Sequence, residues 1–167
     1  ERMIKLFDLK DQFKLFDKKI NKKVCDILSS GNYILGKNVS ELEKSAKQYL
    51  QTKYTLSCNS GTDALIMSLR ALDIGAGDEV ITSPFTYFAT AEAISLVGAK
   101  PVFSDINPDT FNIDPKNIKK YISKKTRAII SVNLFGQACE LKEINTIAKE
   151  SNLYHIEDCA QSFGATY

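Results

Sequence analysis

The chain is poor in the residues that bind metal ions. It contains a single histidine, His155, and four cysteines that show no C-x-x-C spacing: Cys25, Cys58, Cys139 and Cys159. Zinc sites and disulfide frameworks need clusters of these residues, so we expect neither of them. Free thiols are typical of a reducing cytoplasm, and the expected protein is therefore cytoplasmic and has no bound metal.

Charge of one sign and long apolar runs are also missing. Basic and acidic residues number 22 and 20, which leaves a formal net charge of +2, and the lysines are scattered. A surface for nucleic acid or for an anionic membrane is therefore not expected. No apolar run approaches the roughly 18 residues of a membrane span, and the opening "ERMIKLFDLK" lacks the apolar stretch of a secretory signal.

The common glycine motifs for nucleotides are absent as well. No lysine follows a second glycine as in a Walker sequence, and "GAGDEV" lies before its expected strand instead of after it. The fingerprint of a dinucleotide-binding domain needs glycines directly after the first strand. A P-loop enzyme and a nicotinamide-binding domain are therefore disfavoured.

Residues 1–53 have the pattern of a helical lead-in. The stretch "DQFKLFDKKINKKVCDIL" places apolar residues three or four apart on one face: Phe13, Phe16, Ile20, Val24 and Ile27. Two glycines in "SSGNYILGKN" interrupt it. "VSELEKSAKQYL" then predicts a second helix, with Ser40 as its N-cap and Glu43 at the capping-box position.

Residues 54–167 alternate between short β-prone runs and helical patterns. The expected strands are "YTLSC", "DEVITS", "KPVFSDI", "RAIISVNLF" and "LYHIED". The expected helices are "TDALIMSLRAL", "TAEAISLVG", "PKNIKKYIS" (with Asp114 as cap and Pro115 in the first turn) and "ELKEINTIAKES". This rhythm predicts an α/β domain with a mostly parallel sheet flanked by helices, and with ligands at the carboxyl ends of the strands. The segments expected there are "NSGT", "SPFTYFAT", "NPDT", "FGQ" and "DCAQSFG".

Three of these segments carry complementary chemistry. Ser60, Gly61 and Thr62 form a turn that opens a helix, where free N–H groups favour a phosphate, although a simple N-cap without ligand gives the same pattern. Phe85, Tyr87 and Phe88 follow a strand and offer a platform for a planar ring, although at least two of them are expected to be ordinary core residues.

The third segment holds a carboxylate at the end of an apolar strand. Asp158 needs a cation there, and a protonated ring nitrogen is a suitable one, although Asp158 can instead cap the following segment. His155 is expected to be a packed strand residue. A phosphate, a flat ring and a cationic nitrogen together describe pyridoxal 5'-phosphate, which leads to the hypothesis that this cofactor binds here.

The order of these motifs resembles the pyridoxal-phosphate sugar aminotransferases of the DegT/DnrJ/EryC1/StrS family, in the N-terminal part of their large domain. The similar stretches, spread from Met3 to Tyr167, are "GNYILGKNVSELE", "NSGTDAL", "GDEVITSPFTYFATAEAISLVGAKPVFSDI", "FNIDP", "LFGQ" and "IEDCAQSFGA". The resemblance implies a type I, aspartate aminotransferase-like fold, a smaller C-terminal domain that this chain lacks, and a homodimer with shared active sites.

The resemblance also assigns roles to five residues. Gly61 and Thr62 match the turn that binds the cofactor phosphate, and Tyr87 matches the aromatic residue against the ring. Asp158 matches the acid that pairs with the pyridine nitrogen, and Gln161 matches the residue that hydrogen-bonds the ring hydroxyl. The implied reaction moves an amino group from glutamate to a keto group of a nucleotide-linked sugar, in polysaccharide or glycan biosynthesis. The wording of the motifs is most similar to enzymes for UDP-linked 3-keto sugars, including 2-acetamido-3-keto-glucuronate.

One expected residue is not present. The Schiff-base lysine of the family is expected beyond Tyr167, and Lys142 and Lys149 fall instead on a predicted helix. The chain by itself is therefore expected to be inactive. Two alternatives stay open: a relative that uses the same cofactor for dehydration, with histidine in place of the lysine, and a non-catalytic remnant of the fold.

Overall fold

The computed structural model describes residues 8–167. These divide into two compact units, with the boundary between Ser57 and Cys58. The first unit contains the helices α1 (Leu9–Ser30) and α2 (Lys37–Leu50). Both predicted helices are confirmed. Asp8 caps α1 by accepting a hydrogen bond from the N–H of Asp11, and Gly31 ends the helix in the left-handed conformation that favours glycine.

The predicted capping box of the second helix is wrong. Helix α2 begins at Lys37 after Gly36, so Ser40 lies inside its first turn and there is no side-chain cap. The Glu43 carboxylate accepts hydrogen bonds from the N–H and the hydroxyl of Ser57, at 2.9 and 2.7 Å. The N–H and hydroxyl of Ser57 together lower the pKa of Glu43 below its ordinary value.

The same contacts explain why "YTLSC" is not a strand. Its alternating pattern predicted one, yet residues 54–58 pair with no strand of the described chain. The Thr55 hydroxyl donates to the Glu43 carbonyl at 2.7 Å, and Ser57 is held by the Glu43 carboxylate. A strand needs a ladder partner for its backbone groups, whereas these polar groups are satisfied by α2.

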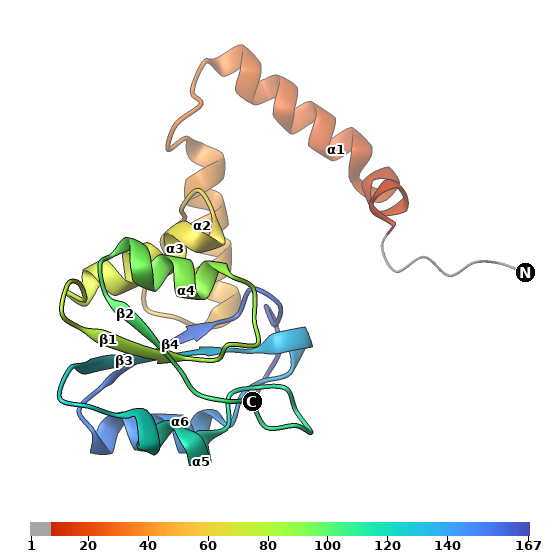
Figure 1. Cartoon of the computed structure of the whole chain (residues 1–167). Coiled ribbons are helices and arrows are strands. Elements are labelled where there is room, and N and C mark those ends of the chain that lie inside the picture. The colour runs from red at the N-terminus through yellow and green to blue at the C-terminus, as the bar shows by residue number, and fades with distance from the viewer. Residues whose placement is uncertain (1–7) are drawn as a thin grey trace, which may run out of the picture. The chain divides into compact units, whose positions relative to one another are not determined.

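The second unit is an α/β structure, as predicted. Its sheet has four parallel strands in the order β2-β1-β3-β4 (Figure 1). The strands are β1 (Glu79–Thr82), β2 (Lys100–Phe103), β3 (Thr126–Val132) and β4 (Tyr154–Asp158). The helices and 3₁₀ turns are α3 (Gly61–Ala71), α4 (Ala89–Leu96), α5 (Pro115–Ile118), η1 (Lys119–Tyr121), η2 (Leu134–Gly136) and α6 (Leu141–Glu150).

Apolar side chains cover both faces of this sheet. Successive strand residues point to opposite faces, so Val80 packs with α3 and α4, whereas Ile81 packs with α5 and α6. Figure 1 shows the two pairs of helices on opposite sides of the sheet. Burial on both faces explains the apolar runs of the two central strands, β1 and β3. Asp114 and Pro115 begin α5 as expected, and the Asp114 carboxylate accepts from the N–H of Lys116.

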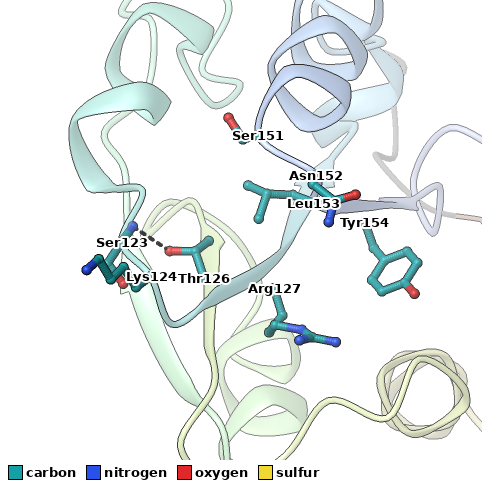
Figure 2. Close-up of a pocket in the computed structure, with 8 residues that line it drawn as sticks. All are labelled: Ser123, Lys124, Thr126, Arg127, Ser151, Asn152, Leu153 and Tyr154. Carbon is teal, nitrogen blue, oxygen red and sulfur yellow. Dashed lines mark hydrogen bonds between the residues drawn. The ribbon is translucent and has the colours of Figure 1, made fainter.

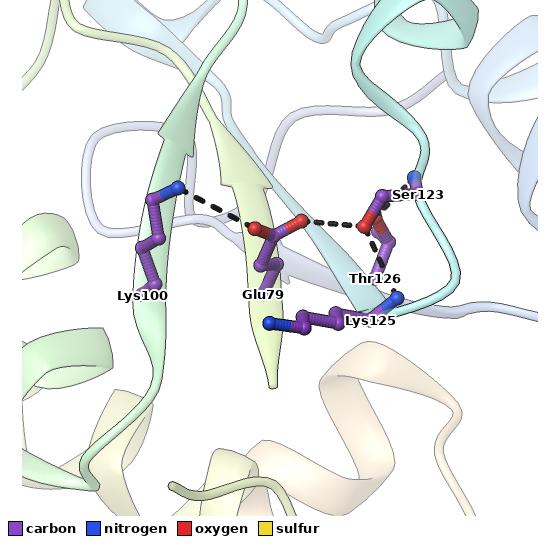
Figure 3. Close-up of polar contacts among 5 residues, drawn as sticks. All are labelled: Glu79, Lys100, Ser123, Lys125 and Thr126. Carbon is purple, nitrogen blue, oxygen red and sulfur yellow. Dashed lines mark hydrogen bonds and ion pairs between the residues drawn. The ribbon is translucent and has the colours of Figure 1, made fainter. Parts of the chain in front are cut away.

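A polar network joins the amino ends of three strands (Figure 3). The Glu79 carboxylate accepts a hydrogen bond from the Ser123 hydroxyl at 2.6 Å and pairs with Lys100 at 3.5 Å. The Ser123 N–H donates to the Thr126 hydroxyl at the start of β3. The hydrogen bond from Ser123 is the main cause that lowers the pKa of Glu79.

The prediction that His155 is a packed strand residue is confirmed. His155 lies in β4, where its Nδ1 is 2.8 Å from the Asn145 side-chain oxygen and its Nε2 is 2.8 Å from the Ser131 hydroxyl. A neutral ring satisfies both partners when Nδ1 donates and Nε2 accepts. Burial lowers the pKa of His155, and this outweighs the opposing effect of Glu157.

His155 therefore makes folding sensitive to acid. The unfolded chain binds the imidazole proton more tightly, so the free energy of unfolding falls as the pH drops below about 6.5, the ordinary pKa of histidine. Because His155 is the only histidine, its ring C2 proton gives one NMR resonance, which we expect to titrate with a midpoint below that value. His155→Gln should remove this part of the acid sensitivity. A midpoint at or above about 6.5 would contradict the burial argument.

Candidate functional site

Five residues singled out in the sequence line one cavity at the carboxyl ends of the strands. Gly61, Thr62, Tyr87, Asp158 and Gln161 all belong to its wall. The other lining residues are Leu65, Thr86, Ala89, Thr90, Val132 and Ala160. The cavity has a volume of about 190 Å³ and collects residues from four separate parts of the chain.

The start of α3 leaves two N–H groups for a ligand. Ser60 is the N-cap: its hydroxyl accepts from the N–H of Asp63 at 3.1 Å, and its carbonyl accepts from the N–H of Ala64 at 3.0 Å. The N–H groups of Gly61 and Thr62 have no acceptor within the part of the chain that the structure describes. A helix of 11 residues also directs its positive dipole end toward this position.

Gly61 keeps the space in front of these N–H groups open. A Cβ at Gly61 would meet no atom within 4 Å, and its φ is not in the left-handed region. Neither protein packing nor backbone conformation therefore requires glycine here. The absence of a side chain instead lets a ligand approach the backbone closely.

The loop after β1 supplies the aromatic side chains. Phe85, Tyr87 and Phe88 are 46%, 78% and 71% exposed, so the expectation that at least two of them are core residues is wrong. The loop runs from the end of β1 at Thr82 to the start of α4 at Ala89. Tyr87 lines the cavity, while the ring of Phe85 packs against Phe111 with centroids 5.8 Å apart.

Asp158 ends β4 and has two different oxygens. One of them, Oδ1, accepts the N–H of Ala160 at 3.0 Å, so the capping interpretation holds for this atom. The other oxygen has no hydrogen-bond partner among the described residues. An acceptor with negative charge is thus available at the cavity, in a position that the backbone turn holds.

Gln161 is held by the segment after β3. Its Oε1 accepts the N–H of Phe135 at 2.7 Å, which connects "FGQ" to the cavity wall. The segment "NPDT", also expected near the ligand, is not part of the wall. Asn107 there accepts the N–H of Asp109 in a surface turn.

Two cysteines, Cys139 and Cys159, lie near the site without lining its cavity. Burial raises the pKa of Cys139 to about 11, and burial also raises the pKa of Cys159.

No group of three or more potential metal ligands occurs among residues 8–167. Likewise, no helix in this range is long and apolar enough to span a membrane. The cavity wall offers hydrogen bonds, one carboxylate and aromatic surface.

A second cavity lies at the opposite end of the strands (Figure 2). It is larger, at about 390 Å³, and is lined by Lys124 and Arg127 together with neutral side chains near the starts of β3 and β4. None of the residues singled out in the sequence lines it. Ligands of open parallel sheets bind at the carboxyl ends, so the smaller cavity is the candidate site.

Sequence reasoning missed several residues of the site. Thr86 and Thr90 line the cavity, although only "FTYFAT" as a whole was singled out. Two buried asparagines, Asn112 and Asn133, hold the backbone of the neighbouring segment. An asparagine inside "FNIDP", next to apolar residues, was the available signal, because a buried amide must find partners.

Comparison with known proteins agrees with this geometry. The model of the DegT/DnrJ/EryC1/StrS aminotransferase family matches residues 14–167. The UDP-2-acetamido-2-deoxy-3-oxo-D-glucuronate aminotransferase of Pseudomonas aeruginosa is 48% identical over 165 residues, which are 99% of this chain and 46% of that protein.

Solved structures show the same fold. The structure of S. venezuelae DesV in complex with a ketimine intermediate superposes with a TM-score of 0.96 at 34% identity, covering 100% of this chain and 45% of that one. NtdA from Bacillus subtilis, with bound cofactor PMP, gives a TM-score of 0.87 at 36% identity, covering 89% of this chain and 34% of NtdA. The chain thus spans about half or less of the length of these proteins. The chain shares its fold with these aminotransferases, and it belongs to the DegT/DnrJ/EryC1/StrS aminotransferase family.

Proposed function

We propose that this chain is the cofactor-binding part of a pyridoxal-phosphate aminotransferase that moves an amino group from glutamate to a keto group of a nucleotide-linked sugar. The observation that carries the proposal is the single cavity lined by Gly61, Thr62, Tyr87, Asp158 and Gln161. The name of the Pseudomonas relative supports a UDP-linked 2-acetamido-3-keto-glucuronate as the acceptor, in polysaccharide or glycan biosynthesis. A homodimer with shared sites and a cytoplasmic location belong to the same proposal and rest on the resemblance.

The residues of the cavity fit the cofactor one by one. The free N–H groups of Gly61 and Thr62 suit a phosphate, and the absent side chain of Gly61 leaves room for it. The exposed ring of Tyr87 offers a face to a planar ring. The unpartnered oxygen of Asp158 holds a proton on the ring nitrogen, which an electron-withdrawing pyridinium requires.

Pyridoxal phosphate, when bound, supplies an electron sink for the negative charge that develops at a substrate carbon as a C–H bond breaks. The protein contacts the charged groups at both ends of this cofactor. Thr62 and Gly61 anchor one end, and Asp158 keeps the other end protonated. Removing either anchor should therefore weaken binding without unfolding the domain.

The first prediction concerns Asp158. Pyridoxamine 5'-phosphate (PMP) binds without a covalent bond, so we expect the chain to bind it in a fluorescence titration. Asp158→Asn keeps an oxygen for the N–H of Ala160 but replaces the free carboxylate oxygen with a donor, and should weaken PMP by roughly ten-fold or more. Asp105→Asn is the matched control, because the Oδ1 of Asp105 also accepts a nearby N–H, that of Ile106, but Asp105 lies outside the cavity. Equal binding by the two variants would refute the assigned role.

The second prediction concerns Gly61. Gly61→Ala adds a methyl group that meets no protein atom, so its unfolding temperature should be no lower than that of the unchanged chain. The methyl group occupies the space proposed for the phosphate, and PMP and inorganic phosphate should both bind more weakly. Ser68→Ala, in the same helix but outside the cavity, should change neither affinity. An unaltered PMP affinity in Gly61→Ala would place the phosphate elsewhere.

The third prediction concerns the reaction. The gene product that contains this chain, given glutamate and UDP-2-acetamido-3-keto-glucuronate, should form 2-oxoglutarate and the UDP-linked 3-amino sugar in equal amounts, measured by mass spectrometry. Omission of glutamate should stop the reaction. Loss of water from the sugar without consumption of glutamate would instead support the dehydratase alternative.

A further inference from the structure

The segment between β3 and α6 has an unusual backbone that the cofactor roles do not explain. Phe135 in the short turn η2 has φ 57° and ψ 19°, the left-handed conformation that non-glycine residues rarely adopt. Its side chain is exposed, so packing of the ring does not account for the conformation. Contacts to the backbone on either side of Phe135 must hold it.

Asn112 supplies these contacts from a distant part of the sequence. Its Oδ1 accepts the N–H of Leu134 at 3.1 Å, and its Nδ2 donates to the carbonyl of Gln137 at 3.0 Å. The two bonds bracket Phe135. Asn112 is only 4% exposed and belongs to the motif "FNIDP", to which the cofactor chemistry assigns no role. A buried amide with both of its groups bonded to one turn constrains that turn strongly.

A second buried asparagine holds the far end of the segment. The Asn133 Oδ1 accepts the N–H of Cys139 at 2.9 Å, and its Nδ2 donates to the Glu157 carboxylate at 2.6 Å. The turn is thus attached at 134, 137 and 139. The N–H of Phe135, inside this turn, donates to Gln161, a residue of the cavity wall.

This N–H determines how the Gln161 amide is oriented. A backbone N–H can only donate, so the oxygen of the amide must face it, as the 2.7 Å distance from Phe135 N to Gln161 Oε1 indicates. The reversed amide would bring two donors together. The group that Gln161 has left for a ligand in the cavity is therefore its NH₂, a donor that favours a ring oxygen in its ionised form.

We propose that Asn112 is a positioning residue of the cofactor site: it holds the turn at Phe135, and the Phe135 N–H in turn orients Gln161 so that its NH₂ donates to the cofactor. The inference rests on the proposed function for the identity of the ligand. It gives the motif "FNIDP" a role in the site without contact between Asn112 and the cofactor.

The first test needs no ligand and no variant. The amide proton of Phe135 should exchange with solvent at least about ten-fold more slowly than that of Gly136, for which the structure describes no acceptor. Both residues are exposed and adjacent, so burial does not separate them. Equal exchange rates in an NMR hydrogen-exchange experiment on the whole chain would overturn the proposal.

The second test is a double-mutant cycle with PMP as the ligand. Asn112→Asp keeps the acceptor for Leu134 but sets an oxygen against the Gln137 carbonyl, and should weaken PMP by about three- to ten-fold. In the Gln161→Ala background the same substitution should have no further effect. Asn117→Asp is the matched control, because Asn117 is a partly buried asparagine that bonds to Asp114, away from the turn.

The outcomes separate the two proposals. If Asn112→Asp weakens PMP equally in both backgrounds, or in neither, Asn112 does not act through Gln161 and the inference fails. If the unchanged chain binds no PMP, the proposed function fails, and the exchange rates still decide whether the turn holds Gln161. If Asn112→Asp does not fold, the exchange comparison on the unchanged chain gives the answer.

Discussion

The parallel pairing of four strands is the constraint on which the site depends. Each crossover returns the chain to the same edge, so the loop after β1 and the end of β4 meet there although they are about 70 residues apart. The sheet can form only if both faces are covered, and the two apolar clusters around Val80 and Ile81 provide this. Each fully buried isoleucine or leucine contributes about 1.5–3 kcal/mol, which makes this edge a rigid base for the polar side chains.

Buried amides are the second requirement, because the loops at this edge carry polar backbone groups away from water. Asn112 and Asn133 satisfy three such groups between Leu134 and Cys139. An unpaired donor or acceptor there would cost about 1–3 kcal/mol, so the same bonds that keep the loop stable also determine its shape. Stability and loop shape are therefore linked in this segment.

The parts that local sequence predicted best are those that depend on local physics. Helices α1, α3, α4 and α6 follow from apolar spacing, and Asp114-Pro115 predicted the start of α5 because capping involves only neighbouring residues. The failures involve distant partners. The segment "YTLSC" has a strand pattern, but Glu43 satisfies its polar groups. Helix α2 begins at Lys37, directly after Gly36, so Ser40 lies inside the first turn and is not the N-cap.

Residue types and their order along the chain determined the α/β class, the family and the five candidate residues, because strand ends in a parallel sheet converge whatever the details of packing. Tertiary structure alone decided how those residues are presented. Contacts between segments more than 20 residues apart decide which end of the Gln161 amide is available and which backbone groups Asn112 bonds. The local turn after β4 decides which oxygen of Asp158 is free. Hydrogen bonds are directional and short-ranged, so such choices are made only when the folded chain brings the partners within about 3 Å of each other.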